Sequence, residues 1–290
     1  KTGKGFKFFR IYAKAKNGKL TLVGCRLFLV SPAPQISLSS QIDPEEYNKW
    51  IDLYEKPSPA EKIKITTLIS QRKLKPKIGI ILNGKSPYSD LVTGTIKSVI
   101  DQYYTNWKLF ITSVDTNSYD DNRVKSLQNR LISQDSVQFN FASTKVDADF
   151  LIFLTPKDRL SPYALVEYIL KLGNNPETKI LYGDDDHIHL GGYRTNPHFK
   201  SKLDKIRLLN LNYIGEVFFI NQELFNQLGG FSEDELIDPY HDFLSRATVK
   251  CKSEQILHIP RVLTHRVEIL SQNNIFDNKK RELTLKRNIP

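Results

Sequence analysis

Residues 180–192 read ILYGDDDHIHLGG, so three aspartates and two histidines follow a short apolar run. Carboxylate and imidazole groups can hold a metal ion, can transfer protons, or can simply form a solvated turn. His187 and His189 could join Asp184 or Asp186 as metal ligands, but two histidines at this spacing are more typical of a solvated strand. The chemistry of the stretch therefore depends on where it lies in the fold.

From residue 76 onward, short apolar runs alternate with amphipathic stretches. We expect strands at 77–83, 107–114, 137–140, 149–154 and 179–183, and helices at 88–102, 120–133 and 161–173. Ser161 is expected to cap the last of these helices, with Pro162 at its first position. This repetition predicts a right-handed α/β sheet with helices on both faces.

Ligands of such sheets bind at the carboxyl ends of the strands, so we expect the chemistry in the loops after residues 83, 114, 154 and 182. The three aspartates would lie just after the fifth strand. The second half is less regular. It predicts a strand, a helix and a Gly-Gly turn over 215–231, a helix over 238–250, one or two strands around Pro260, and a helix with a loose end in 271–290.

Residues 1–75 have a different character. Asn17-Gly18 either ends an amphipathic helix or forms a hairpin turn, and the Thr, Val and Phe content of 19–30 favours the hairpin. Helices are expected at 43–56, capped by Asp43, and at 58–72. We therefore divide the chain into a basic N-terminal extension and helical linker (1–75), an α/β domain (76–270) and a C-terminal tail (271–290).

Composition limits the function classes. The 290 residues are 40% hydrophobic and 26% charged, with a formal net charge of +10. No apolar run reaches the roughly 18 residues that a membrane span needs, and there is no signal peptide pattern. The basic residues form no recognisable nucleic-acid module, so we expect no nucleic-acid partner. The chain starts at Lys1 and contains no methionine, so we expect a piece of a longer protein with additional domains.

The two cysteines have neither metal-ligand nor disulfide spacing, which fits a reducing compartment. The first residues are both basic and aromatic: Lys7, Arg10, Lys14 and Lys16 stand among Phe6, Phe8 and Phe9. They form either an ordinary solvated face or a contact with an anionic membrane surface. We expect a cytoplasmic protein, with peripheral contact to the inner face of the cytoplasmic membrane as the sharper alternative.

Several stretches together carry a family resemblance. In chain order they are EYNKWIDLYE, SVIDQYYTNWKLFI, LSPYALVEYI, ILYGDDDHI, NPHFKSKLDKIRLLNLNYI, FINQELFNQLGGF, DFLSRA and HIPRVLTHR. From about Tyr47 to His265 the sequence resembles family 2 glycosyltransferases, specifically the rhamnosyltransferase-like enzymes of bacterial surface polysaccharide synthesis. The resemblance implies a GT-A fold, a nucleotide-sugar donor, a glycan acceptor and inverting transfer. It also implies a divalent cation, Mn²⁺ or Mg²⁺, on the leaving diphosphate and a carboxylate base.

The donor-side motifs of that family are altered here. The D-x-D position after the strand at 149–154 reads Thr155-Pro156-Lys157-Asp158, so only Asp158 remains as an acid. Either Lys157 takes over part of the charge of the cation, or donor catalysis has been lost. Of the acidic pair expected after the second strand, only Asp115 is present. We therefore assign Asp115, Lys157 and Asp158 to donor binding, and Asp158 and His265 as candidate metal ligands.

The position of the catalytic base is altered as well. Tyr240 stands where the family places an acid, and its ordinary pKa near 10 makes it a poor base at neutral pH. The candidate bases are Asp242, which matches a family aspartate, and the nearby Asp238. His258 is interpreted as structural, because it lies beside Ile256 and Ile259.

The acceptor side matches the family better than the donor side does. The resemblance places Asp184, Asp185 and Asp186 beside the acceptor cleft, together with the turn at Gly229 and Gly230. Two functions remain open. One is a working sugar transferase. The other is a catalytically inactive GT-A module that binds a glycan, a nucleotide or a partner enzyme.

Overall fold

The computed structural model describes residues 5–14, 20–30, 43–55, 59–72, 75–84, 86, 88–112, 137–139, 146–189 and 192–268. The chain divides into two compact units, Lys1–Gln41 and Ile42–Pro290.

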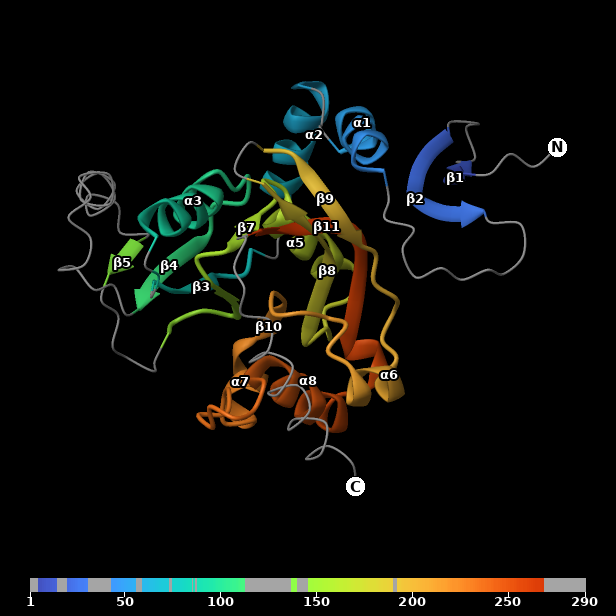
Figure 1. The fold of residues 1–290 in the computed structure, drawn as a ribbon. Coiled ribbons are helices and arrows are strands. Elements are labelled where there is room, and N and C mark those ends of the chain that lie inside the picture. The colour runs from blue at the N-terminus through green and yellow to red at the C-terminus, as the bar shows by residue number, and fades with distance from the viewer. Residues whose placement is uncertain are drawn as a thin grey trace. The chain divides into compact units, whose positions relative to one another are not determined.

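The first unit contains a β-hairpin. Strands β1 (Gly5–Lys14) and β2 (Leu20–Val30) are antiparallel, and their register runs from Gly5 opposite Val30 to Lys14 opposite Leu20 (Figure 1). The antiparallel pair of strands agrees with the hairpin interpretation and not with a helix over residues 5–14, while Asn17 and Gly18 themselves lie outside the described residues.

The second unit begins with two helices, α1 (Pro44–Tyr54) and α2 (Pro59–Ser70). The Oδ1 atom of Asp43 accepts a hydrogen bond from the backbone N–H of Glu45 at 2.9 Å, so Asp43 caps α1 as predicted.

One mixed sheet forms the centre of this unit. Its strands are β3 (Ile78–Asn83), β4 (Trp107–Thr112), β5 (Val137–Phe139), β6 (Phe150–Leu154), β7 (Asp158–Leu160), β8 (Ile180–Ile188), β9 (Arg194–His198), β10 (Phe219–Asn221) and β11 (Ile256–Val267). The order is β5-β4-β3-β6-β10-β8-β11-β7, and β9 pairs with β8 outside this path. Strands β5, β4, β3 and β6 are parallel to one another, and β8 is parallel to β11, whereas β10, β7 and β9 run antiparallel to their neighbours.

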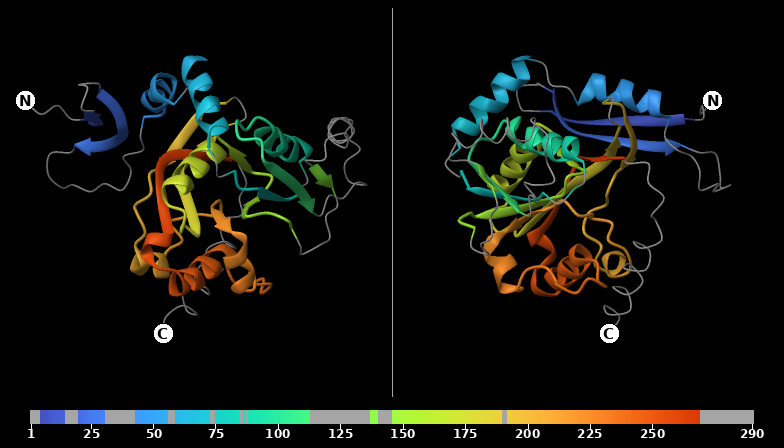
Figure 2. Two further views of the ribbon diagram at one scale, coloured as in Figure 1. Left: turned by 180° about the vertical axis from the view of Figure 1, so that it is seen from behind. Right: turned by 60° about the vertical axis from the view of Figure 1, so that its left-hand side comes forward.

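Helices cover both faces of this sheet (Figure 2). They are α3 (Ser89–Ile100), α5 (Ala164–Asn174), α6 (Lys205–Asn210), α7 (Gln222–Gln227) and α8 (Pro239–Lys250). Alternate residues of one strand belong to different cores: Leu181 packs with α3 and α5, while Ile180 and Tyr182 pack with α6 and α8. The α/β sheet with helices on both faces is therefore confirmed.

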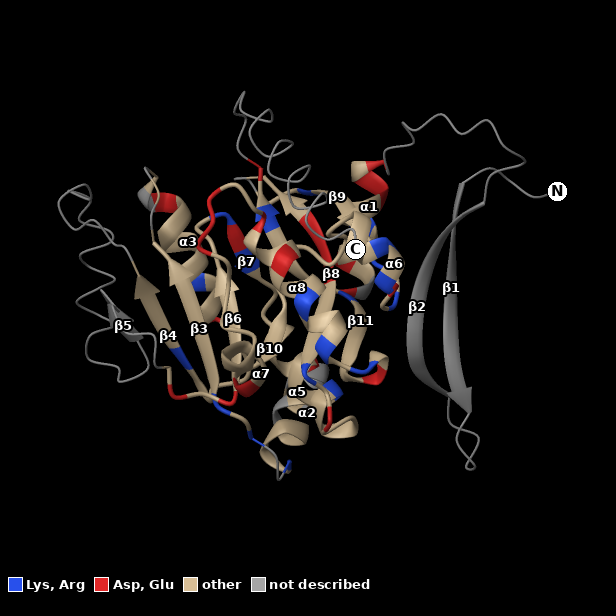
Figure 3. Cartoon of the chain, turned by 90° about the horizontal axis from the view of Figure 1, so that it is seen from below, with Lys and Arg blue, Asp and Glu red and all other residues tan. Residues whose placement is uncertain are grey.

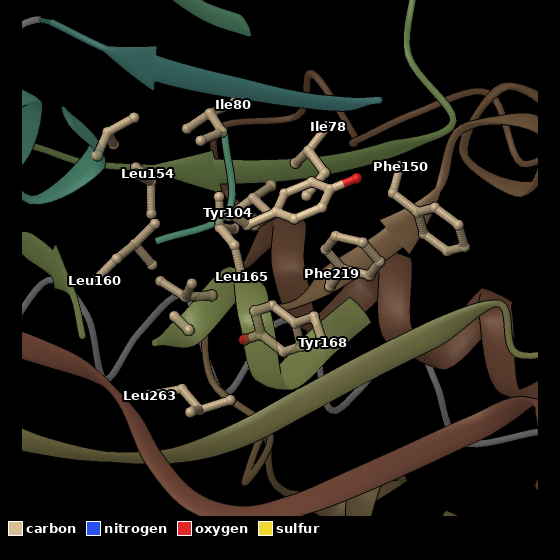
Figure 4. Close-up of a cluster of buried hydrophobic side chains, with 14 of the residues drawn as sticks. Ile78, Ile80, Tyr104, Phe150, Leu154, Leu160, Leu165, Tyr168, Phe219 and Leu263 are labelled. Atoms are coloured by element: carbon tan, nitrogen blue, oxygen red, sulfur yellow. The ribbon is translucent and has the colours of Figure 1, made fainter. Parts of the chain in front are cut away.

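Aromatic rings fill the core on the α3 and α5 side (Figure 4). The Phe219 ring stacks on Phe150 with a centroid distance of 4.4 Å and on Tyr168 with a centroid distance of 5.0 Å. This packing joins α5 to β6 and β10, and β10 in turn is the sheet neighbour of β8.

Two predicted boundaries are wrong. Helix α5 begins at Ala164, without a side-chain cap, and the carbonyl of Ser161 accepts a hydrogen bond from the N–H of Ala164 at 2.9 Å. Ser161 and Pro162 therefore form the preceding turn. Strand β8 continues through the three aspartates, because β11 pairs with it as far as Val267 opposite Ile188. The aspartates lie within the strand rather than after it.

The region around Pro260 is a single strand, β11, with a register shift between Ile259 and Val262. Proline has no N–H to donate and is tolerated at such an irregularity. The predicted helix at 120–133 and the tail at 271–290 lie outside the described residues. Within the described residues, none of the helices combines the length and apolar character needed to cross a bilayer.

Candidate functional site

A polar pocket opens beside the carboxyl-terminal halves of β8 and β11. Its volume is about 420 Å³, including the part open to solvent. It is lined by Asp158, Asp185, His187, Gly215, Glu216, Val217, Thr264, His265 and Arg266. Because β8 and β11 are parallel and end together, the pocket lies where α/β sheets usually bind ligands. We call this cluster the Arg266 pocket.

Arg266 brings a positive charge into the pocket. Its Nη2 donates to Glu216 Oε2, and its Nε lies 3.8 Å from Asp158 Oδ1. Burial alone would lower the pKa of Arg266, but Glu216 and Asp158 outweigh it and raise the pKa above its ordinary value. The guanidinium is therefore a permanent cation, and its side chain is 40% exposed.

Asp158 is buried beneath Arg266, and the preceding turn holds it in place. Its Oδ2 accepts hydrogen bonds from the backbone N–H and from Oγ1 of Thr155, each at 2.7 Å. Burial raises the pKa of Asp158, although Arg266 acts in the opposite direction. The predicted donor residue Asp158 thus lies in the pocket, with one carboxylate oxygen on Thr155 and the other facing Arg266.

The turn over 155–158 is fixed from both sides. The carbonyl of Lys157 accepts a hydrogen bond from the N–H of Val267 at 2.7 Å, which places Lys157 next to β11. Arg159 Nη1 donates to Thr95 Oγ1 at 2.6 Å and to the carbonyl of Pro156 at 2.9 Å, which ties the turn to α3. The Lys157 side chain itself is exposed, so it lies beside the pocket rather than in its lining.

The first two aspartates of the triplet bind basic groups from other segments. Asp184 is buried, and its Oδ1 lies 2.7 Å from His258 Nε2 and 2.8 Å from the backbone N–H of Lys200. Asp185 lines the pocket, and its Oδ2 lies 2.6 Å from Lys200 Nζ. Burial alone would raise the pKa of Asp185, but His198 and Lys200 outweigh it and hold the pKa below its usual range.

Asp186 is fully buried and has the most partners (Figure 3 shows this acidic segment of β8 in red). Its Oδ2 accepts from Arg194 Nε at 2.5 Å and from the Tyr47 hydroxyl at 2.7 Å. Its Oδ1 lies 2.6 Å from His265 Nδ1. Arg194 also binds Glu55 at 2.6 Å, so Asp186 and Arg194 together fasten α1 to the sheet.

The pocket histidines differ in how firmly they are held. The bond to Asp186 fixes the His265 ring and assigns its proton to Nδ1, because a carboxylate can only accept. His187 Nδ1 is buried without a hydrogen-bond partner, 3.9 Å from Glu268 Oε2. His258 is a buried histidine bound to Asp184, which agrees with its interpretation as structural.

The candidate bases lie at the start of α8, outside the lining of the pocket. Asp238 caps the helix, and its Oδ1 accepts from the N–H groups of Tyr240 and His241 at 3.0 and 3.1 Å. Asp242 is buried, and its Oδ2 accepts from Arg246 Nε at 2.9 Å and lies 2.8 Å from Arg246 Nη2. Burial, with Glu216 and Asp158 nearby, raises the pKa of Tyr240 above its ordinary value, so this phenol stays protonated.

Arg246 also connects Asp242 to the turn at Gly229 and Gly230. It donates to the carbonyls of Leu228 and Gly230 at 2.5 and 2.8 Å. Both glycines have positive φ, 74° and 73°, a conformation that other residues rarely adopt. The predicted acceptor-side turn is therefore a tight turn that Arg246 holds against α8.

The implied divalent cation does not fit the residues present. Lys157 occupies the place of one expected ligand, and Asp158 is already bound by Thr155 and faces Arg266. Across the described residues, no three His, Cys, Asp or Glu side chains converge on a point that could hold a metal ion. The pair Asp158 and His265, both in the pocket, is an incomplete set of ligands.

The structure adds Glu216 and Arg266, which were not predicted from the sequence. A charged residue at the end of an apolar strand was a signal for Arg266, and a glutamate directly after Gly215 was a weaker one for Glu216. Their pairing joins segments 50 residues apart, so no local pattern contains it. Asp115 lies outside the described residues.

The mixed sheet and its two helical layers form an α/β fold that matches solved structures of the glycosyltransferase type. The crystal structure of Staphylococcus aureus TarS 1-349 matches with a TM-score of 0.52 and 11% identity, over 66% of this chain and 60% of that chain. Identity this low shows the fold alone. A complex of the mannosyltransferase PcManGT from Pyrobaculum calidifontis with GDP-Man and Mn²⁺ matches with a TM-score of 0.45 and 11% identity, over 74% of this chain and 67% of that chain.

Two curated proteins are similar in sequence. The uncharacterized protein y4gI of Sinorhizobium fredii is 28% identical over 211 residues, 69% of this chain and 23% of that protein. The O-antigen biosynthesis protein RfbC of Myxococcus xanthus is 25% identical over 233 residues, 76% of this chain and 18% of that protein. The chain thus spans less than a quarter of either relative. No protein-family model matches it.

Proposed function

We propose that this chain is a glycosyltransferase domain of the family 2, GT-A type that transfers a sugar from a nucleotide-sugar donor to a glycan acceptor in bacterial polysaccharide assembly. The observation that carries the proposal is a charged pocket at the carboxyl ends of β8 and β11 in a glycosyltransferase-type fold. The similarity to an O-antigen biosynthesis protein and the rhamnosyltransferase-like motifs support the polysaccharide context. Further domains in a longer chain are part of the same proposal.

The donor would bind on the β7 side of the pocket. Asp158 lies in the lining and Lys157 beside it, and Asp115 is kept as a donor residue on the resemblance alone. Asp185 also lines the pocket, so we assign it to ligand contact. Asp184 and Asp186 are buried and bound to His258 and Arg194 of the same chain, so we propose that they position the site and do not contact the ligand.

In the transfer step, the acceptor hydroxyl attacks the anomeric carbon while the bond to the diphosphate breaks. A base removes the hydroxyl proton, and the diphosphate leaves with the electron pair. We propose Asp238 or Asp242 for this role. Asp242 is held by the charged guanidinium of Arg246, whereas Asp238 accepts from the neutral N–H groups of Tyr240 and His241, so Asp238 is the favoured candidate. The phenol of Tyr240 keeps its proton at neutral pH, so it cannot act as the base.

Two measurements test this function. Isothermal titration with uridine, guanosine and thymidine diphosphates asks whether a nucleotide binds. Release of nucleoside diphosphate from the matching nucleotide sugars asks whether the chain is catalytic. Asp238→Asn should lower kcat by about 100-fold to 10,000-fold, as loss of a general base does, with a smaller change in KM. If no nucleotide sugar is turned over while a nucleotide or glycan still binds, the transferase proposal fails.

Binding of a nucleotide or glycan without turnover of any nucleotide sugar would support the alternative, a catalytically inactive GT-A module. The observation that favours it is the engagement of the candidate carboxylates: Asp242 binds Arg246, and Asp158 binds Thr155. Such a module would bind a glycan, a nucleotide or a partner enzyme. Equal turnover by wild type and by variants at both candidate bases would point to a different base rather than to an inactive module.

A further inference from the structure

The guanidinium of Arg266 is held in a fixed orientation. Glu216 Oε2 accepts from Nη2, and Asp158 Oδ1 lies 3.8 Å from Nε. Asp158 is itself held by two hydrogen bonds from Thr155. Two carboxylates from different segments therefore orient the guanidinium, one through a hydrogen bond and one through an ion pair.

One edge of this guanidinium remains available to a ligand. The Arg266 side chain is 40% exposed and lines the pocket, and no described residue makes a hydrogen bond or ion pair with Nη1. A guanidinium presents its N–H donors as a planar fork that matches two oxygens of a phosphate. Arg266 thus lines the pocket and keeps Nη1 without a partner among the described residues, so it can offer this edge to a phosphate.

Glu216 acts as a replaceable partner for Arg266. Its side chain is 34% exposed, and it follows Gly215, whose φ is +89°. A partly exposed carboxylate can turn into solvent and be hydrated there, unlike the buried Asp158. An incoming phosphate oxygen would compete with Glu216 for Nη2 and would leave the contact with Asp158 intact.

A divalent cation would compete with Arg266 for the same place. To coordinate Asp158 Oδ1, it would approach to about 2.3 Å. The guanidinium Nε already lies 3.8 Å from that oxygen, so two like charges would face each other at short range. Lys157, at the expected position of a second ligand, adds a further positive charge beside the pocket.

We propose that Arg266 is the diphosphate-binding group of this pocket and takes the place of the divalent cation that the resemblance implies, with Glu216 as the counter-ion that the diphosphate displaces. This inference rests on the proposed function for its ligand, a nucleoside diphosphate. The guanidinium would neutralise charge on the leaving diphosphate without a metal, so ligand binding would not depend on Mn²⁺ or Mg²⁺.

The test is isothermal titration of the whole chain with inorganic pyrophosphate and with nucleoside diphosphates, in EDTA and in Mn²⁺. Wild-type affinity should be the same in both buffers. Arg266→Gln should weaken binding by about tenfold to a hundredfold, the range for hydrogen bonds to charged groups. Glu216→Gln should strengthen it by about twofold to fivefold, because it removes a competing, partly exposed carboxylate. If the Arg266–Glu216 pair only stabilised the fold of the pocket, both substitutions would weaken ligand binding.

Arg261→Gln is the matched control. Arg261 lies on the same strand, is 64% exposed and pairs with Glu167, away from the pocket lining. The affinity of Arg261→Gln for pyrophosphate and for nucleoside diphosphates should equal that of wild type. If Arg266→Gln does not fold, Arg266→Lys keeps the charge without the planar fork and should still weaken binding. Wild-type-like binding by Arg266→Gln, loss of wild-type binding in EDTA, or no pyrophosphate binding at all would overturn the inference.

The two proposals fail in different ways. If turnover of a nucleotide sugar requires Mn²⁺ and is unchanged by substitution of Arg266, the transferase function is supported and the role of Arg266 is excluded. If pyrophosphate binds without a metal and through Arg266, but no nucleotide sugar is turned over, the role of Arg266 is supported and the transferase function is excluded. The pocket would then be an anion site in a non-catalytic module.

Discussion

At the scale of single residues, the Asp-Asp-Asp run is a set of anchors rather than a metal motif. Asp184 binds His258, Asp185 binds Lys200, and Asp186 binds Arg194 and Tyr47. Each carboxylate therefore has its charge or hydrogen-bonding capacity met by the protein itself. Only Asp185 lines the pocket.

Asp186→Asn should lower the free energy of unfolding by about 3–5 kcal/mol, the usual cost of removing one partner of a buried ion pair. Arg194, whose side chain is 11% exposed, would keep Glu55 but lose its buried partner. Urea denaturation measures the change. Glu45→Gln is the control, because the Glu45–Lys49 pair is 3.9 Å apart and highly exposed, so its loss should leave stability unchanged. Equal effects of the two substitutions would rule out the anchoring role.

Asp158→Asn should leave the protein as stable as wild type or more stable at neutral pH. Burial raises the pKa of Asp158, so the folded state binds its proton more tightly than the unfolded chain does. The wild type therefore loses stability as pH rises from the unfolded value, about 3.9, through the folded pKa, and the loss is constant above it. The Asn variant has no such loss.

Thermal melts of both proteins at about pH 4 and pH 7 check this, because the gap in Tm should widen in favour of the variant across that window. A wild type that is the more stable protein at pH 7 would mean that the attraction of Arg266 outweighs the burial of Asp158.

The sequence predicted roughly where the acidic residues of the site lie in the fold, but not which side chains pair with them. The partner of Asp186 on α1, Tyr47, is 139 positions away, and Glu216 and Arg266 are 50 apart. Such pairs depend on tertiary placement, which no spacing within one segment encodes. The run therefore looked like a ligand set, although the fold uses most of it internally.

At the scale of elements, periodic patterns predicted the main strands and helices well, and their ends less well. Apolar content stops at Gly183, so the sequence predicted a strand that ends there. Pairing with β11 nevertheless extends β8 to Ile188, because Asp184 and Asp186 find partners on β11 in His258 and His265. The predicted helix cap at Ser161 was also wrong. The carbonyl of Ser161 accepts hydrogen bonds from Gln102 and from the N–H of Ala164, and helix α5 begins at Ala164.

Helix α1 is fastened to β9 by one amide side chain as well as by ion pairs. Asn48 Nδ2 donates to the carbonyl of Arg194 at 2.7 Å, and Asn48 Oδ1 accepts from the N–H of Arg194 at 3.1 Å. The side chain thus imitates a strand neighbour along the edge of β9. This contact makes α1 part of the same unit as the sheet.

Asn48→Ala should make α1 open locally without unfolding the sheet. Loss of the two hydrogen bonds to Arg194 should lower the free energy of opening by about 1–3 kcal/mol, so amide exchange over residues 44–54 should rise by about fivefold to a hundredfold. Hydrogen exchange read by mass spectrometry gives the result by segment. Lys49→Ala, on the exposed side of the same helix, is the control and should change nothing. Faster exchange in β8 or β11 as well would show that α1 supports the whole unit.

At the scale of the whole molecule, the chain divides into two compact units, and the described buried hydrophobic residues of the second unit begin at Tyr47. The hairpin unit, Lys1–Gln41, is a separate compact body. We therefore expect the α/β unit to keep its Tm when residues 1–41 are removed. The hairpin would then be available for a role of its own.

We propose that this role is peripheral contact with the anionic inner face of the cytoplasmic membrane. Lys7, Arg10, Lys14 and Lys16 stand among aromatic residues in this unit, and each basic residue near an anionic surface contributes about 1 kcal/mol. In flotation with vesicles that contain phosphatidylserine, the intact chain should float and the chain without residues 1–41 should stay in solution. Binding should weaken as salt increases, because screening shortens the reach of these charges. Neutral phosphatidylcholine vesicles are the control, and equal flotation of both chains would assign any membrane contact to the α/β unit instead.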